Sequence, residues 1–228
     1  RLFEIPKDVK YIQAKPRMKK YIEYSSKIYG IYLKYVSKDD IHVYSIDEAF
    51  LDVTSYLKLY KMSPCELAKV IMKDIFDTTG ITATAGVGTN MYLAKIALDI
   101  TAKHVSDNIG YLDVDKYKEE LWHHVPLTDF WQVGKGIEAR LNKLGLYDMY
   151  DVAHVDESVL YKEFGVNAKF LIDHSWGIEP CLISDIKKYK PKATSMSNGQ
   201  VLFRDYNYID ARKVLTEMID TLVLQLVD

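Results

Sequence analysis

The chain has 228 residues, of which 48% are hydrophobic and 27% are charged, and its formal net charge is −2. That length can bury the core of one large domain or of two to three small ones, whereas the scarcity of Gly and Pro (11 and 6) excludes collagen-like and low-complexity classes. The two cysteines, Cys65 and Cys181, are too few and too far apart for a disulfide framework or a CxxC zinc site, and no apolar run approaches the roughly 20 residues that a membrane-spanning helix needs.

The cysteine usage predicts a cytoplasmic protein, because unpaired thiols fit a reducing compartment. The chain begins with Arg1 rather than Met and ends within a helical pattern, so we expect a fragment of a longer protein. A net charge of −2 does not by itself indicate a nucleic-acid partner, so local patches have to decide that question.

The first half of the chain alternates between helical and strand patterns. After an irregular start, apolar residues at helical spacing predict an amphipathic helix from about Arg17. The segment Ile41–Thr54 is rich in β-branched and aromatic residues, which predicts two strands meeting at Asp47-Glu48.

A second helix has the clearest boundaries in the sequence. Ser63, Pro64 and Glu66 form a capping box with Pro at the first helical position, and Gly80 is a typical helix end. The predicted buried face of this helix carries Leu67, Val70, Ile71 and Ile75.

Two more strands and a helix are predicted to complete this half. Ile81–Val87 is predicted to be a strand, Thr89-Asn90 to cap a helix that runs to about Lys103, and Gly110–Val114 to be a short last strand. The order helix, strand, strand, helix, strand, helix, strand predicts an α+β layer in which helices pack on a sheet.

The second half is predicted to consist of short helices, punctuated by glycines, after about Asp115. The acid-free basic stretch Lys187–Lys192 is predicted to be a linker. Beyond it, Ser195–Tyr206 is predicted to be a strand and Ala211–Val227 a helix, a unit too small for a core of its own.

Asp47 and Glu48 are the sharpest candidates for chemistry. Adjacent carboxylates repel each other unless a cation neutralises them, and hard divalent cations such as Mg²⁺ prefer oxygen ligands. The pair at a strand end therefore suggests a metal site, although a solvated acidic turn has the same sequence pattern.

Two glycine-rich turns are candidates for phosphate contacts. Gly86-Val87-Gly88 leads into a helix on whose exposed side we place Lys95, an arrangement that suits an anion, although an ordinary strand-to-helix turn with a solvated lysine is the commoner cause of this pattern. Gly134-Lys135-Gly136 lies between two predicted helices, like a helix-hairpin-helix whose backbone N–H groups approach a DNA phosphate, although a tight turn between packed helices explains it too.

Three runs together resemble the Y-family translesion DNA polymerases, most closely the UmuC-like bacterial branch. They are Tyr44–Asp52 (YSIDEAFLD), Ala85–Ala97 (AGVGTNMYLAKIA) and Phe130–Ile137 (FWQVGKGI). The first run is highly specific, and the likeness extends over nearly the whole chain.

The resemblance implies a domain plan. Residues 1–18 would end the fingers, 19–106 would form a partial palm of ferredoxin-like topology, and 107–186 would form a helical thumb with the helix-hairpin-helix turn. Residues 187–228 would be a linker and the start of a truncated α/β little finger.

The resemblance also implies roles for single residues. Asp47 and Glu48 match two of three catalytic carboxylates that hold two Mg²⁺ ions, and Lys95 matches a lysine on the incoming deoxynucleoside triphosphate. Gly134, Lys135 and Gly136 match the turn that grips primer-template DNA. The strand with the third carboxylate is missing, as are most of the fingers and of the little finger.

The implied function is a DNA-directed DNA polymerase, a nucleotidyltransferase that inserts deoxynucleotides opposite damaged bases in DNA repair and the SOS response. A sliding clamp or a recombinase filament would bind the parent protein through the missing regions. No membrane is expected as a partner. Two alternatives remain, a non-catalytic DNA-binding module and a nucleotide cyclase with a ferredoxin-like palm. The 228-residue fragment alone is expected to be inactive.

Overall fold

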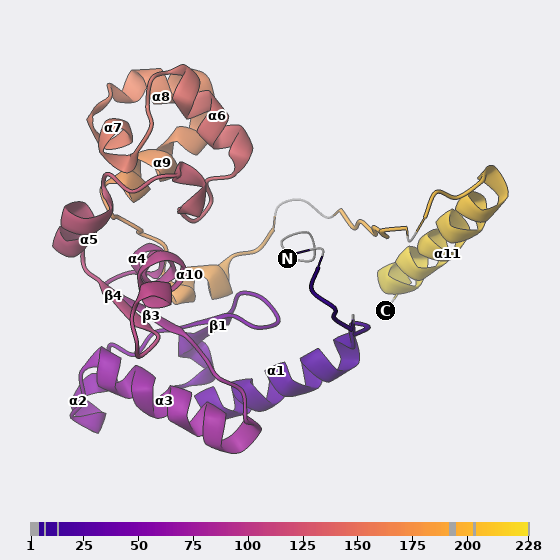
Figure 1. Ribbon diagram of the computed structural model, residues 1–228, viewed down its shortest axis with the longest axis horizontal. Coiled ribbons are helices and arrows are strands. Elements are labelled where there is room, and N and C mark those ends of the chain that lie inside the picture. Colours follow the sequence, from indigo (N-terminus) through magenta and orange to yellow (C-terminus); the bar gives the residue numbers. More distant parts are fainter. Residues whose placement is uncertain (1–4, 7, 13, 192–194, 203, 228) are drawn as a thin grey trace. The chain divides into compact units, whose positions relative to one another are not determined.

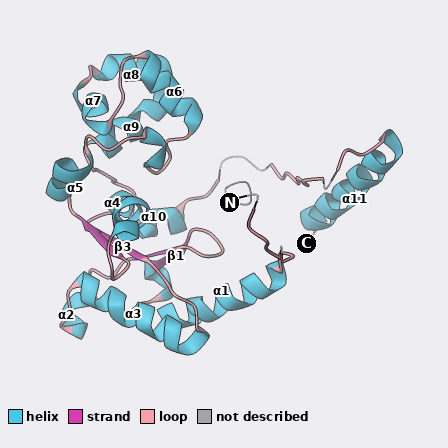
Figure 2. Cartoon of the chain, viewed as in Figure 1, coloured by secondary structure: helices cyan, strands magenta, loops and turns pink. Residues whose placement is uncertain are grey.

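The computed structural model describes residues 5, 6, 8–12, 14–191, 195–202 and 204–227 (Figure 1). The chain divides into two compact units, Arg1–Lys187 and Lys188–Asp228. Helices dominate the described part of the chain, and the strands are short (Figure 2).

The amino-terminal part of the first unit follows the predicted order of helices and strands, with one short extra helix, α2. Its elements are α1 (Met18–Tyr32), the 3-10 turn η2 (Lys38–Asp40), β1 (Ile41–Val43), β2 (Ala49–Leu51), α2 (Leu57–Tyr60), α3 (Pro64–Thr79), β3 (Ala85–Gly88), α4 (Met91–Ile96), the π-helical turn η3 (Ala97–Thr101), the 3-10 turn η4 (Ala102–His104) and β4 (Ile109–Leu112).

Helix α3 begins and ends where the sequence predicts. The Ser63 hydroxyl accepts a hydrogen bond from the Glu66 amide, and the Glu66 carboxylate accepts one from the Ser63 amide at 2.7 Å. Gly80 ends the helix in the left-handed conformation, with φ 72°. Three of the four predicted core residues are buried against Ile31 of α1, namely Leu67, Ile71 and Ile75. Val70 is 36% exposed, because it lies beside this face rather than on it.

The four strands form two separate pairs rather than the single sheet that a ferredoxin-like palm implies. Strands β1 and β2 are antiparallel, with Ile41 opposite Leu51, and β3 and β4 are parallel, with Ala85 opposite Ile109. Within the described residues, no hydrogen-bonded ladder joins the two pairs.

Strand β3 is shorter than the predicted Ile81–Val87. The length of β3 is limited by its partner strand, because β4 begins only at Ile109, opposite Ala85. The residue before it, Asn108, has a left-handed backbone (φ 56°) that turns the chain there. Residues 81–84 therefore face no strand that could pair with them.

Helix α4 lies directly on the backbones of β3 and β4. A Cβ atom added to Gly86 would lie 2.1 Å from the carbonyl oxygen of Ala94, and one added to Gly88 would lie 2.2 Å from the Ala94 nitrogen. At Gly110 of β4, the added atom would be 2.3 Å from the carbonyl oxygen of Ala97. No side chain can occupy these three positions, so the glycines allow the close packing of helix and strands.

The predicted helix from Asn90 to about Lys103 is helical but not uniform. Asn90 caps α4 by accepting from the Leu93 amide at 2.8 Å. The segment then continues as the π-helical turn η3 and the 3-10 turn η4. Such a π turn shifts the angular position of the side chains that it carries.

The rest of the first unit is helical, as predicted. Its elements are α5 (Val114–Leu121), the 3-10 turn η5 (Leu127–Asp129), α6 (Lys135–Lys143), α7 (Met149–His154), α8 (Glu157–Phe164), the 3-10 turn η6 (Gly165–Asn167), α9 (Ala168–Ser175) and α10 (Ile183–Lys188).

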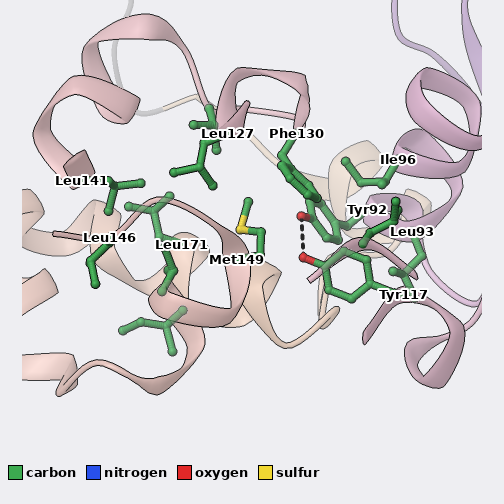
Figure 3. Packing of buried hydrophobic residues seen from close by; sticks show 14 of the residues in the cluster. Tyr92, Leu93, Ile96, Tyr117, Leu127, Phe130, Leu141, Leu146, Met149 and Leu171 are labelled. Atoms are coloured by element: carbon green, nitrogen blue, oxygen red, sulfur yellow. Dashed lines mark hydrogen bonds between the residues drawn. The ribbon is translucent and has the colours of Figure 1, made fainter. Parts of the chain in front are cut away.

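The largest buried cluster extends from Tyr92 on α4 to Ile172 on α9 (Figure 3). Within this cluster, the hydroxyl groups of Tyr92 and Tyr117 lie 3.3 Å apart, and that of Tyr117 donates to the carbonyl oxygen of His174. Burial raises the pKa of both phenols, so they stay neutral. The core therefore joins α4 to the helices that follow it.

His174 is a polar member of this core and is only 3% exposed. Its ring stacks on Tyr92 with a centroid distance of 4.0 Å, and its Nε2 lies 3.0 Å from a carboxylate oxygen of Glu179. Burial lowers the pKa of His174, and the nearby Glu179 only partly opposes that effect. The imidazole is therefore neutral in the folded protein at neutral pH.

The second unit contains helix α11 (Tyr208–Val227), which confirms the predicted last helix. The predicted strand Ser195–Tyr206 is wrong: its described residues form no strand, because no neighbouring strand is there to pair with their backbone groups. Part of the predicted linker is also helical, since Lys187 and Lys188 end α10. None of the helices in the described ranges is both long and apolar enough to cross a membrane.

The close packing of α4 on β3 generates a first prediction. Replacing Gly86 by Ala should lower the free energy of unfolding by roughly 2–4 kcal/mol, and the melting temperature with it. The reason is that backbone atoms of Ala94 and Leu98 would have to move. Gly30→Ala is the matched control. Gly30 lies in α1 with open space around it, so this change should stabilise the chain by about 0.5–1 kcal/mol. Thermal unfolding followed by circular dichroism measures both, and equal effects would contradict the packing argument.

The buried His174 generates a second prediction. Its pKa is lowered on folding, so the unfolded chain takes up a proton first as the pH falls through the ordinary pKa of about 6.5. Stability should therefore fall between pH 7.5 and pH 5.5, and this fall should be smaller in His174→Gln. Urea unfolding at several pH values measures it. Replacing the exposed His104 by Gln should leave the dependence unchanged.

Candidate functional site

Asp47 and Glu48 lie in the loop between β1 and β2, where the sequence predicts them. The loop is closed by the carbonyl oxygen of Glu48, which accepts from the amides of Tyr44 and Ser45 at 3.0 and 3.1 Å. The Ser45 hydroxyl donates to a carboxylate oxygen of Asp47 at 2.8 Å. Both carboxylates are thus held at the same tight turn, with Asp47 exposed and Glu48 half-buried.

Lys95 reaches this loop from helix α4 and is 8% exposed, so its predicted place on an exposed helix face is wrong. Its ammonium group donates to both carboxylate oxygens of Glu48, at 2.9 and 3.0 Å. It also lies 3.1 Å from a carboxylate oxygen of Asp99. Burial disfavours the charged ammonium, but its hydrogen bonds to Glu48 and Asp99 outweigh this effect and raise the pKa of Lys95. Lys95 is therefore charged.

The pairing explains how adjacent acids coexist at this turn. Lys95 carries one positive charge against the three carboxylates of Asp47, Glu48 and Asp99. The local charge stays negative, so the site attracts a further cation. A solvated acidic turn is therefore an incomplete description, because Glu48 is engaged by a buried lysine.

The carboxylate oxygens are the donors that Mg²⁺ prefers. The described residues nevertheless contain no group of three or more His, Cys, Asp or Glu side chains placed to hold a metal ion. The donor chemistry therefore fits a hard divalent cation, while the number of ligands does not complete its shell. Mg²⁺ commonly keeps several waters and takes substrate phosphates as ligands, which suits a site with two protein carboxylates.

The sequence reasoning missed Asp99. It lies four residues after Lys95 in the turn η3, and this spacing places oppositely charged side chains together on a helix. The spacing is visible in the sequence, whereas the involvement of Glu48 is not.

An aromatic cluster joins the acidic loop to the segment before Gly134. The indole Nε1 of Trp131 donates to the Tyr44 hydroxyl at 3.0 Å. The rings of Tyr44, Phe50 and Trp131 lie within 5.7–5.8 Å of one another, centroid to centroid. Tyr44 and Trp131 are 87 positions apart in the sequence, so spacing along the chain could not reveal their contact.

The turn before α4 does not form the anion site that its glycines suggest. Helix α4 has only six residues, and the Asn90 side chain already occupies one of its free amides by accepting from Leu93. The amide nitrogen of that side chain donates to the carbonyl oxygen of Gly177 at 2.8 Å. The structure therefore favours an ordinary strand-to-helix turn, in which Gly86 and Gly88 serve packing.

Gly134 and Gly136 differ from these packed glycines. Gly134 caps α6 in an extended conformation, and Gly136 lies inside the first turn of α6 rather than in the connecting turn. A Cβ atom added to either would meet no atom of the protein within 4 Å. The preceding helix is only the 3-10 turn η5. Both glycines and the exposed Lys135 thus present backbone and positive charge to the surface.

Comparisons with known proteins connect this arrangement to one family. Residues 1–99 match the impB/mucB/samB family. The chain is 33% identical over 222 residues to the putative UV-damage repair protein UvrX of Bacillus subtilis strain 168, covering 96% of this chain and 51% of that protein. It is 34% identical over 206 residues to DNA polymerase IV 2 of the same organism, covering 87% and 47%.

Solved structures agree with the sequence comparisons. A DinB family error-prone DNA polymerase from Sulfolobus solfataricus matches with a TM-score of 0.61 and 29% identity, covering 74% of this chain and 50% of that one. The insertion ternary complex of Dbh DNA polymerase matches with a TM-score of 0.59 and 28% identity, covering 77% and 47%. The chain therefore spans about half the length of the relatives that it matches.

Proposed function

Because the chain belongs to the impB/mucB/samB family of Y-family proteins, we propose that it is the part of a translesion DNA polymerase that carries two metal-binding carboxylates. Its parent protein would add deoxynucleotides opposite damaged template bases. The observation that carries this proposal is the Asp47-Glu48 pair, held at one turn and kept locally negative beside Lys95, in a chain similar to DNA polymerase IV.

Asp47 and Glu48 would hold Mg²⁺ ions, two of them in the complete enzyme. A bound divalent cation stabilises the negative charge that develops during phosphoryl transfer. Ser45 orients Asp47 by donating to its carboxylate, and Lys95 orients Glu48 in the same way. These contacts reduce the reorganisation needed when ligands for a cation assemble, which is the usual source of catalytic electrostatic stabilisation.

Lys95 remains our candidate for contact with the incoming deoxynucleoside triphosphate. Its charge suits a phosphate, but its hydrogen bonds go to Glu48 and Asp99 in the structure. Contact with a triphosphate therefore requires Lys95 to change partners.

The domain plan implied by the resemblance is part of the same proposal. Residues 19–106 would form the palm, 107–186 the thumb and 187–228 the start of the little finger. Support comes from the order of elements up to β4 and from the division between the units at Lys187 and Lys188. Primer-template DNA would contact Gly134, Lys135 and Gly136, and a clamp or recombinase partner would bind parts outside this chain.

For the chain by itself, a DNA-binding module is a second candidate function. The open surroundings of Gly134 and Gly136 favour it, since a phosphate can approach an amide most closely where no side chain intervenes. The similarity to DNA polymerases favours both of these functions over a nucleotide cyclase.

Substitution of the carboxylates tests the polymerase proposal. In a parent protein completed to the length of its relatives, Asp47→Asn or Glu48→Gln should lower primer extension by at least about 10²-fold, because each removes a ligand of the catalytic cation. DNA binding should persist. Extension of a labelled primer in Mg²⁺ measures the loss.

Two controls belong to that experiment. Asp77→Asn removes a carboxylate that pairs with Lys73 on the surface of α3, and it should leave extension unchanged. The 228-residue chain alone should not extend a primer. Wild-type turnover in both carboxylate variants would refute the metal assignment.

Substitution of the open glycines tests the DNA contact. Gly136→Ala should weaken binding of the chain to a primer-template duplex several-fold, because the methyl group keeps a phosphate away from the backbone. The fold should be unaffected, since the added Cβ meets no protein atom within 4 Å. Fluorescence anisotropy at several salt concentrations should give a log–log slope of roughly −0.9 per neutralised phosphate.

Gly30→Ala is the matched control for this measurement, because Gly30 is also a helical glycine with open surroundings. It should bind DNA like the unchanged chain. If Gly136→Ala binds equally well while Lys135→Ala does not, the contact depends on side-chain charge and the backbone mechanism is wrong.

A further inference from the structure

Lys95 shares one buried ammonium group between two carboxylates from different elements. Glu48 comes from the β1–β2 loop, with 34% of its side chain exposed, and Asp99 comes from the turn η3, with 30% exposed. The Lys95 side chain itself is 9% exposed. An ammonium group has three donors, and the two carboxylates together accept them.

This sharing matters once Glu48 binds a cation, a step that rests on the proposed function. A carboxylate that ligates a divalent cation has less negative charge to offer a neighbouring ammonium. Lys95 would then keep its charge at a buried position with its main partner weakened. A buried charge without a partner is costly, and it would oppose binding of the cation.

Asp99 is placed to remove that cost. It lies on the same helical segment as Lys95, four residues further along, so its distance from Lys95 does not depend on the β1–β2 loop. Among the described residues, the side-chain hydrogen bond recorded for Asp99 goes to Lys95. The carboxylate therefore has no competing structural task in this part of the chain.

We propose that Asp99 is a positioning residue that retains the Lys95 ammonium group when Glu48 turns to a divalent cation, so that the carboxylate pair can bind the cation without leaving a buried lysine unpaired. Asp99 does not touch the cation in this proposal. It acts through Lys95, and it would hold that lysine beside the site where a triphosphate is expected.

The reactivity of lysine amines tests the retention without any metal. The chain is treated with an excess of acetic anhydride, and acetylation of each lysine is followed by mass spectrometry. Glu48→Ala imitates the withdrawal of Glu48. If Asp99 retains Lys95, the rate at Lys95 should rise by less than about threefold in this variant and by about tenfold or more in the double variant with Asp99→Asn.

The pair of Lys34 and Asp74 supplies the matched control. It joins the turn that follows α1 to α3 at 3.0 Å, but 54% of the Lys34 side chain is exposed. Lys34 should react rapidly in the unchanged chain and equally in every variant above. Rapid reaction of Lys95 in Glu48→Ala alone, at a rate like that of Lys34, would overturn the proposal.

Binding of Mn²⁺ tests the functional consequence. Free Mn²⁺ is measured by electron paramagnetic resonance during titration of the chain. Asp99→Asn should weaken Mn²⁺ binding about threefold to tenfold, because Glu48 is then the sole partner of Lys95. In a Lys95→Gln background, the same change should have less than about a twofold effect. An equal effect in both backgrounds would mean that Asp99 acts through its charge alone, contrary to the proposal.

These measurements separate the inference from the proposed function. If Asp47→Asn and Glu48→Gln leave Mn²⁺ binding unchanged, the cation is not on the carboxylate pair and the proposed metal site fails, whatever the acetylation rates show. Should Lys95→Gln fail to fold, the single variant Asp99→Asn decides: addition of Mn²⁺ should accelerate acetylation of Lys95 in that variant more than in the unchanged chain. Equal acceleration in the two proteins would refute the retention by Asp99.

Discussion

Helix α4 rests on strands β3 and β4 with backbone against backbone, and this contact determines where the site residues lie. Gly86, Gly88 and Gly110 leave no room for a Cβ atom against Ala94 and Ala97. A helix held this close to the strands has little freedom to rotate or slide. The contact therefore sets the direction of Lys95, one residue after Ala94, and through Lys95 the place of Glu48.

The buried ion pair changes how the acidic turn should be understood. The proximity of Asp47 and Glu48 suggests a requirement for an external cation, yet Lys95 already supplies part of the neutralising charge. The lysine is charged because its hydrogen bonds to Glu48 and Asp99 compensate for its burial. A divalent cation at this turn would thus compete with an internal cation, and the balance between them is set by Asp99 as well as by Glu48.

The acidic loop is also tied to the segment that leads into α6. Trp131 donates to Tyr44, the first residue of the loop, and both rings pack on Phe50 of β2. Val133 and Leu141 are buried on either side of the open glycines of α6. In the proposed polymerase, the surface that would meet the DNA backbone and the carboxylates that would hold the cation are therefore connected through this aromatic contact.

Local signals in the sequence determined the elements whose ends depend on neighbouring residues. Helix α3 follows from Ser63, Glu66 and Gly80, and the acidic turn follows from two strand-forming runs on either side of Asp47-Glu48. Composition alone predicted strands wrongly at residues 81–84 and at the described residues of 195–206. Both segments have a suitable composition, but a strand also needs a neighbour for its backbone hydrogen bonds. The tertiary structure alone decided that Lys95 is buried against Glu48, 47 residues away, because packing on glycine backbones, rather than helical periodicity, turns it inward.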